Sequence, residues 1–216
     1  MGAPHVPLAL VDRAESLLDR SDRAVLGIAG PPGSGKSTLT SALLSALGSR
    51  LGADAVGHLP MDGFHLADVQ LDRLGLRDRK GAPETFDVDG YVAALGRLHS
   101  SPASVLYVPG FERDLEQPIA AAIAIPPSAR LVVTEGNYLL LPDGGWQHVR
   151  PLLAEVWFVG DDDVRRSRLV RRHEEFGKSP DAARAWVDEV DEPNARLVAS
   201  TRGAADLVVD MASLVE

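Results

Sequence analysis

The chain has 216 residues, a formal net charge of −9 at pH 7 and no cysteine, which suits one domain and excludes a disulfide framework or a thiolate metal site. The acidic total disfavours nucleic acid as a partner, and no apolar run reaches the roughly 18–20 residues that span a bilayer. Because Met1–Asp12 also lacks the pattern of a signal peptide, we expect a cytoplasmic protein without a membrane partner, and homo-oligomer formation stays open.

The first half of the chain alternates helical and strand patterns. Apolar residues at helical spacing predict an amphipathic helix over Leu8–Arg20, and a short apolar run predicts a buried strand over Ala24–Ala29. Helical periodicity returns over Lys36–Arg50. The next predicted elements are a strand over Ala55–Pro60, a helix over Leu66–Leu74, a polar loop over Arg77–Thr85 and a helix over Val88–Leu98.

The second half continues this alternation. It contains predicted strands over Ser104–Val108, Arg130–Thr134, Glu155–Val159 and Asp206–Val209, helices over Asp161–Glu175 and Asp181–Ser200, and an irregular stretch over Gly110–Pro127. Strands that alternate with helices indicate an α/β fold, with a parallel sheet covered by helices on both faces. No linker divides the chain, so we predict a single domain over 1–216, with a lid near 161–180 and an acceptor-site excursion near 77–127.

A phosphate-binding motif lies between the first strand and the second helix. The run Gly30-Pro-Pro-Gly-Ser-Gly-Lys-Ser37 fits the pattern G-x-x-x-x-G-K-[ST], in which glycines let the backbone N–H groups face phosphate oxygens. Lys36 supplies a charge for the β- and γ-phosphates, and the Ser37 hydroxyl is a magnesium ligand. The alternative, a glycine-rich turn that matches by chance, is disfavoured by the strand–loop–helix context. The predicted ATP-binding residues are Gly30, Pro31, Pro32, Gly33, Ser34, Gly35, Lys36, Ser37 and Thr38.

The class of P-loop protein follows from what surrounds this motif. A GTPase would carry an N-K-x-D segment, and neither Asn137 nor Asn194 fits one. A small-molecule kinase fits the length and needs a base for the acceptor hydroxyl. Asp62 follows the second strand and therefore stands at the carboxyl edge of the sheet, where it can take that proton. The alternative role for Asp62 is an N-cap of the next helix.

Two further groups complete the predicted chemistry. Glu135 follows a buried strand, where a carboxylate needs a partner such as Mg²⁺; the alternative is a structural ion pair. Arg165, Arg168 and Arg172 are spaced i, i+3 and i+7 and so share a helix face that can neutralise charge on the transferring phosphoryl group. We assign Arg168 and Arg172 to catalysis and Arg165 to nucleotide binding. A solvated basic face, paired with nearby acidic residues, is the alternative.

Together these residues resemble the phosphoribulokinase/uridine kinase family, which includes bacterial pantothenate kinase, and within it a bacterial nucleoside/nucleotide-kinase-like branch whose members include fructose-transport-system kinases. The resembling segments are GPPGSGKST (Gly30–Thr38), PMDGFHL (Pro60–Leu66), RKGAPETFDVDGY (Arg79–Tyr91), VPGFERDLEQP (Val108–Pro118), TEGNYLLL (Thr134–Leu141) and RLVRRHEEFGKS (Arg168–Ser179). The resemblance implies a P-loop NTPase fold, with three α/β/α layers, a parallel five-stranded sheet and a helical lid over ATP. It also implies that Asp62 is the catalytic base.

The resemblance further implies an acceptor site built from residues after the second strand and in the excursion. The implied residues are Phe64, His65, Asp87, Tyr107, Phe111, Arg113 and Tyr138. For Asp87 a helix-capping role is an equal alternative, and Arg113 could instead pair with Glu112 or Asp114.

The sequence therefore predicts an ATP- and Mg²⁺-dependent kinase whose partner is a small hydroxyl-bearing acceptor: a nucleoside, a pantothenate-like alcohol or a sugar. A nucleotide-binding regulator or slow NTPase is the alternative. Asp62, Glu135 and the arginine face favour the kinase, because a regulator has no need of a base at that strand end. Four histidines, His5, His58, His99 and His148, are interpreted as ordinary surface or loop residues.

Overall fold

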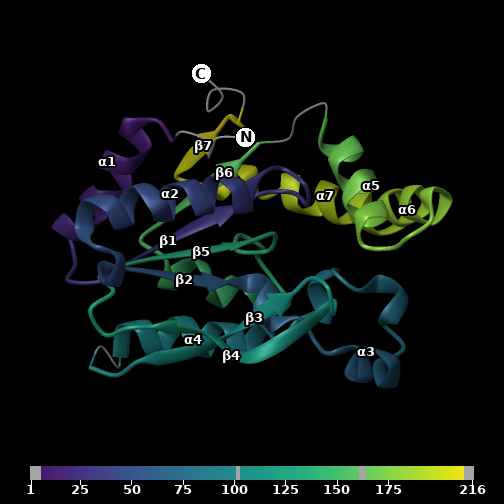
Figure 1. Cartoon of the computed structure of the whole chain (residues 1–216), viewed down its shortest axis with the longest axis horizontal. Coiled ribbons are helices and arrows are strands. Elements are labelled where there is room, and N and C mark those ends of the chain that lie inside the picture. The colour runs from purple at the N-terminus through teal and green to yellow at the C-terminus, as the bar shows by residue number, and fades with distance from the viewer. Residues whose placement is uncertain (1–5, 101–102, 161–163, 212–216) are drawn as a thin grey trace.

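A parallel five-stranded sheet forms the centre of the computed structural model, which describes residues 6–100, 103–160 and 164–211 (Figure 1). The strands run in the order β2 (Val56–Pro60), β5 (Leu131–Gly136), β1 (Ala24–Ala29), β6 (Glu155–Val159) and β7 (Leu207–Val209). Every residue of β1 is buried, as expected for a central strand covered on both faces. The predicted α/β class and the parallel five-stranded sheet implied by the resemblance are confirmed.

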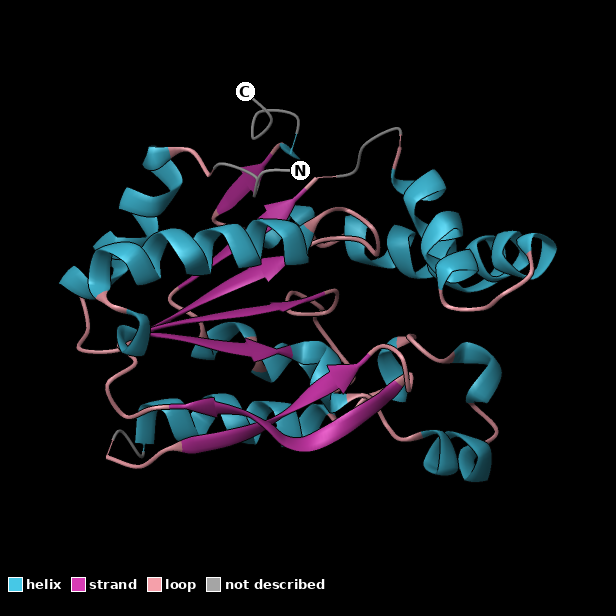
Figure 2. Ribbon diagram, viewed as in Figure 1, coloured by secondary structure: helices cyan, strands magenta, loops and turns pink. Residues whose placement is uncertain are grey.

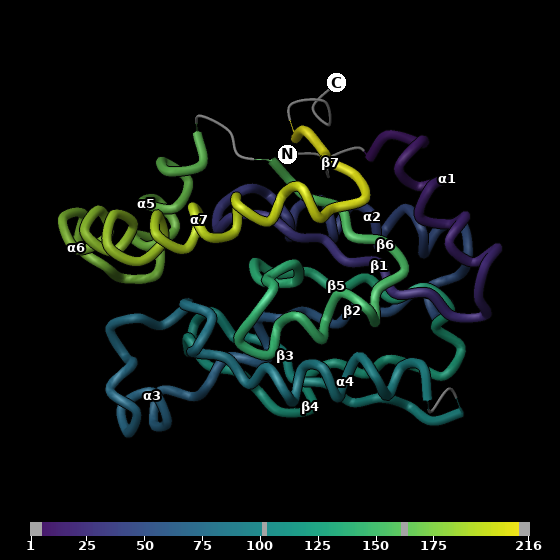
Figure 3. The backbone as a smooth tube through the Cα atoms, turned by 180° about the vertical axis from the view of Figure 1, so that it is seen from behind, coloured from purple at the N-terminus to yellow at the C-terminus, as the bar shows by residue number. Residues whose placement is uncertain are grey.

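Helices cover both faces of the sheet and make the three-layer arrangement seen in Figure 2. On one face, α1 (Leu8–Ser16) and α2 (Lys36–Leu51) pack against Leu26, Ile28 and Val133. On the other face, α4 (Val88–Ser100) and α7 (Glu192–Ala199) pack against the opposite set of strand side chains, and α7 lies on the near side in Figure 3. None of the helices in the described ranges is long and apolar enough to cross a bilayer.

The predicted strand over Ser104–Val108 does not join this sheet. It forms β3 (Leu106–Glu112), which pairs antiparallel with β4 (Gln117–Ile125) in a separate hairpin. The stretch Gly110–Pro127, predicted to be irregular, is therefore mostly regular strand. The hairpin is held against the sheet because Leu106, Val108 and Ile125 are buried in the same core as α4.

The lid region also differs from the sequence prediction. The helix α5 (Arg165–Glu175) is present, whereas the predicted Asp161–Glu175 begins in residues outside the described ranges. The predicted helix Asp181–Ser200 is divided into α6 (Pro180–Trp186), a π-helical segment over Val187–Asp191, and α7. A widened turn of this kind shifts the helical register and is frequent at functional sites.

The acceptor-side segment is short and irregular. It consists of a 3₁₀ turn after β2 (Met61–Phe64), α3 (Asp68–Leu74) and two further 3₁₀ turns at Arg77–Arg79 and Pro83–Thr85.

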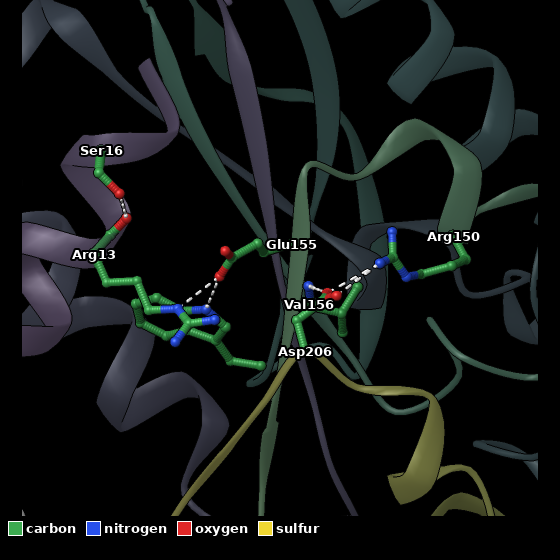
Figure 4. A network of polar contacts seen from close by, with 7 residues as sticks. Arg13, Ser16, Arg150, Glu155, Val156 and Asp206 are labelled. Atoms are coloured by element: carbon green, nitrogen blue, oxygen red, sulfur yellow. Dashed lines mark hydrogen bonds and ion pairs between the residues drawn. The ribbon is translucent and has the colours of Figure 1, made fainter. Parts of the chain in front are cut away.

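Polar contacts fix the start of β6 between its neighbours (Figure 4). Arg13 of α1 donates to Glu155 at 2.9 Å, which ties α1 to the first residue of the strand. On the other side, Asp206 accepts from Arg150 and from the backbone N–H of Val156 at 2.7 Å. These contacts lie at the amino end of the strand, so the carboxyl end stays open for the site described next.

Candidate active site

A cleft of about 830 Å³ opens at the carboxyl end of the sheet. Its walls come from the loop between β1 and α2, the 3₁₀ turn after β2, the tip of the β3–β4 hairpin, the segment after β5, and the lid helices α5 and α6. These segments are distant in sequence but converge because parallel strands present their carboxyl ends at one edge, where α/β folds bind ligands.

The loop between β1 and α2 has the backbone conformation that its glycines predict. Gly30, Gly33 and Gly35 all have positive φ, and a Cβ at Gly30 would lie 2.6 Å from the carbonyl oxygen of Val159. Only glycine therefore fits at Gly30. The helix α2 begins at Lys36 and directs its amino end at the cleft. Of the nine predicted residues, Pro32, Gly33, Gly35, Lys36, Ser37 and Thr38 line the cleft, whereas Gly30, Pro31 and Ser34 are buried and do not.

Lys36 is buried and donates its ammonium hydrogen to the Pro31 carbonyl oxygen at 2.8 Å. Burial lowers the pKa of Lys36 to about 8, although the nearby carboxylates of Glu135 and Asp62 act to raise it, and Arg172 and Arg165 lower it. Both carboxylates and both arginines are thus close enough to influence one ammonium group. An anion with several oxygens would compensate this desolvated charge.

Glu135 and Ser37, the two predicted metal ligands, lie side by side. Burial raises the pKa of Glu135, the charge of Asp62 raises it further, and Lys36 and a hydrogen bond with the Ser37 side chain lower it. No cluster of three or more His, Asp or Glu side chains that could hold a metal by itself occurs in the described ranges. Kinase sites usually bind Mg²⁺ with one or two protein oxygens plus substrate phosphates, and the Ser37–Glu135 pair fits that requirement.

Asp62 lies in the 3₁₀ turn directly after β2 and lines the cleft. It is not the N-cap of α3, because that position is Ala67. Its carboxylate lies 3.5 Å from Arg113, which forms no ion pair with Glu112 or Asp114. The turn is seated on the hairpin, since a Cβ at Gly63 would come within 2.2 Å of the Pro109 carbonyl oxygen.

The structure brings three of the seven predicted acceptor residues to the cleft: His65, Phe111 and Arg113. The His65 ring lies 4.0 Å from that of Phe86 and 4.9 Å from that of Phe111, and burial lowers the pKa of His65. This wall therefore presents an aromatic stack and a guanidinium group beside Asp62. Such a wall can hold a polar molecule that has one flat or apolar part.

The other four predicted acceptor residues do not line the cleft. Phe64 is buried in the core, and Tyr107 is 60% exposed on the outer side of the hairpin. Asp87 caps α4 by accepting from the backbone N–H of Gly90 at 2.9 Å, which is the capping role left open above. Tyr138 is buried and donates to the Gly81 carbonyl oxygen.

The lid helix α5 is seated directly on the phosphate-binding loop. Arg168 and Arg172 line the cleft, and Arg168 lies 3.4 Å from the Gly33 carbonyl oxygen. Arg165 does not line the cleft. It is buried, donates to the Pro32 carbonyl oxygen at 3.3 Å and forms an ion pair with Glu192 at 2.5 Å.

Several cleft residues were not predicted from the sequence. His173 pairs with Asp191 at 2.7 Å, and Lys178 lies 4.6 Å above the Trp186 ring. Outside the cleft, His58 was expected to be an ordinary surface or loop residue, but it lies on β2, with its Nε2 3.9 Å from Glu135. Only the lysines offered a signal: the chain has three, and all of them line the cleft.

Lys80, on the acceptor wall, joins separate segments of that wall. Its ammonium group donates to Asp68 at 2.7 Å and to the Glu116 carbonyl oxygen, and lies above the Phe111 ring. The loop before α4 and the hairpin tip are thereby held together.

No protein-family model matches the chain, but comparisons with known proteins find similar proteins that are named as kinases. A Schizosaccharomyces pombe protein named "Putative uridine kinase" is 36% identical over 169 residues, which are 76% of this chain and 72% of that protein. The solved structure of a "putative fructose transport system kinase" from Silicibacter sp. TM1040 is 34% identical, with a TM-score of 0.82 over 93% of this chain and 98% of the other. A Saccharomyces cerevisiae structure described as "a putative P-loop containing kinase" is 19% identical and shares the fold, with a TM-score of 0.77 over 94% of this chain and 98% of the other.

Proposed function

Because the chain belongs to the phosphoribulokinase/uridine kinase family of P-loop kinases, which use ATP, we propose that it transfers the γ-phosphate of Mg·ATP to a hydroxyl group of a small metabolite. The observation that carries this proposal is the position of Asp62. Its carboxylate lines the cleft beside Arg113, and its charge raises the pKa of both Lys36 and Glu135. A carboxylate at this point can take a proton from an acceptor that faces the phosphate-binding loop.

The proposed reaction has one chemical step. Asp62 accepts the proton of the acceptor hydroxyl, the hydroxyl oxygen forms a bond to the γ-phosphorus, and the bond between that phosphorus and the β–γ bridging oxygen breaks to release ADP. Lys36 and Arg172 neutralise negative charge on the phosphoryl oxygens. Mg²⁺, held through Ser37 and Glu135, would neutralise further phosphate charge. Arg113 holds the Asp62 carboxylate in place through their 3.5 Å contact.

The test is ADP release from Mg·ATP with a panel of acceptors: uridine, cytidine, fructose, pantothenate and related alcohols. Release that depends on one acceptor establishes the kinase, and a slow rate equal with every acceptor points to an NTPase or regulator. With an active acceptor, Asp62→Asn should lower kcat by about 10²–10⁴-fold while leaving ATP affinity nearly unchanged.

The matched control is Asp89→Asn, which changes an exposed carboxylate in the first turn of α4, outside the cleft. It should behave as the wild type. Undiminished turnover in Asp62→Asn would remove Asp62 from the reaction.

A further inference from the structure

Apart from Arg168, which lies 3.4 Å from the Gly33 carbonyl oxygen, the lysines and arginines that line the cleft divide into two groups by their partners. Lys80 and Arg77 pair with Asp68 at 2.7 Å, and Arg113 pairs with Asp62. In contrast, Lys36, Arg172 and Lys178 line the cleft with no carboxylate oxygen of the described residues within 4.0 Å. Uncompensated cations in a cleft are positioned to meet anionic ligands.

Lys36 and Arg172 belong to the phosphate end of the cleft. Lys36 is part of the phosphate-binding loop, and Arg172 is near enough to lower the pKa of Lys36. Under the proposed function their charge is matched by the phosphates of Mg·ATP. Lys178 does not belong to this phosphate end, because it lies beyond the carboxyl end of α5, in the turn before α6.

The local structure keeps Lys178 apart from carboxylates. Asp191 supplies the carboxylate on the lid side of the cleft, and it is bonded to His173 at 2.7 Å. Lys178 instead lies over the Trp186 ring at 4.6 Å, a contact that orients an ammonium group without neutralising its charge. The lid therefore presents a positioned, unneutralised cation to the cleft.

We propose that the acceptor carries an anionic group, a carboxylate or a phosphate, and that Lys178 binds this group from the lid while the acceptor hydroxyl faces Asp62. This inference rests on the proposed function and adds a substrate class to it. It also gives the lid a second role, since an acceptor held by Lys178 closes the cleft from the lid side. Neutral sugars and nucleosides would be poor acceptors compared with anionic relatives of similar size.

Trp186 provides a direct measure of binding. The chain has three tryptophans, and Trp146 and Trp157 are buried, whereas Trp186 lines the cleft. With the nucleotide site saturated by Mg²⁺ and a non-hydrolysable ATP analogue, tryptophan fluorescence is titrated with matched pairs. The carboxylate pairs are pantothenate with panthenol and glycerate with glycerol, and the phosphate pair is fructose 6-phosphate with fructose.

We expect at least one anionic member to bind about tenfold or more tightly than its neutral partner, since a hydrogen bond to a charged group is lost without the anion. Lys178→Met should remove that advantage, and Lys178→Arg should restore most of it. The control Arg184→Met changes an exposed lid cation that pairs with Asp181 outside the cleft, and it should keep the advantage. Whether a carboxylate pair or the phosphate pair shows this difference in affinity identifies the anionic group that the site binds.

Three results would overturn the inference: no preference for any anionic member in the wild type, an unchanged preference in Lys178→Met, or an effect of Lys178→Met on nucleotide affinity alone. Turnover assays keep this outcome separate from the proposed function. Turnover with neutral acceptors and no anion preference would leave the kinase intact and remove the inference. Anion preference without turnover of any acceptor would support anion binding by Lys178 and contradict the proposed kinase activity.

Discussion

Lys36 is held in an environment that does not suit a charge. Burial lowers its pKa from 10.5 to about 8, and its hydrogen bond goes to a backbone carbonyl of its own loop. In the protein without nucleotide, the ammonium group therefore costs stability, and the phosphates of ATP are what would compensate it. Binding function and folding stability are opposed at this one residue, as they often are at functional sites.

We predict that Lys36→Met raises the stability of the nucleotide-free protein at pH 7, by up to about 3 kcal/mol, and abolishes the stabilisation by Mg·ATP. The folded-state pKa lies below the unfolded one, so the wild type gains stability as pH rises from about 8 to about 10.5, and the difference between the proteins shrinks there. Thermal unfolding across pH 7–10.5, with and without Mg·ATP, measures this. A normal nucleotide-induced shift in Lys36→Met would contradict the assigned role.

The strands that were predicted well from the sequence are those buried on both faces of the sheet. β1, β5 and β6 are apolar along nearly their whole length because both faces are covered, so burial and strand pattern coincide. β4 was missed because its run Gln117–Ile125 contains proline and four alanines, which are poor strand formers. Its pairing with β3 depends on core contacts of Leu106, Val108 and Ile125, which sequence spacing does not display.

The β3–β4 hairpin, which contains the unpredicted strand β4, contacts the 3₁₀ turn that carries Asp62. Gly63, the residue after Asp62, packs its backbone against Pro109 of β3. The hairpin therefore fixes the position of the Asp62 carboxylate in the cleft. The place of Asp62 at a strand end could be predicted from the sequence, but the contact with the hairpin that supports it could not.

We predict that Gly63→Ala destabilises the protein by about 1–3 kcal/mol and lowers kcat at least tenfold, because the new Cβ meets backbone atoms that cannot move without shifting the turn. Gly96→Ala in α4 is the control. A Cβ there meets nothing within 4 Å, and alanine should stabilise the helix by about 0.5–1 kcal/mol. Denaturant unfolding and turnover measure both variants. Equal behaviour of the two would mean that the hairpin does not position Asp62.

At the scale of the whole molecule, the site divides into a part that is contiguous in sequence and a part that is assembled. The phosphate-binding motif could be recognised in the sequence because its residues are consecutive and their spacing follows from the ligand, and six of the nine residues predicted there line the cleft. The pairs His173–Asp191 and Lys178–Trp186 were not predicted, because each joins residues 8–18 positions apart across α5, α6 and the π-helical segment.

The lid helix α5 packs closely against the phosphate-binding loop. A Cβ at Gly33 would lie 2.8 Å from Leu169 of α5, so the helix rests on the loop without space between them. Arg165 joins three segments, since it reaches the Pro32 carbonyl oxygen from α5 and pairs with Glu192 of α7. Arg165 was predicted to bind nucleotide; in the structure it contacts the loop backbone and does not line the cleft, so we expect it to affect ATP binding through the shape of the loop.

We predict that Arg165→Met destabilises the protein by about 3 kcal/mol. The Arg165 side chain is only 6% exposed, and its loss leaves the Glu192 carboxylate without an ion-pair partner. ATP affinity should fall as well, and hydrogen exchange should increase in the loop and in α5 together. Arg171→Met is the control: its side chain is 81% exposed and pairs with Glu175 one turn away, so its effect should stay below about 0.5 kcal/mol. Faster exchange confined to α5 would show that the lid moves independently of the loop, and the coupling argued from Arg165 would then be wrong.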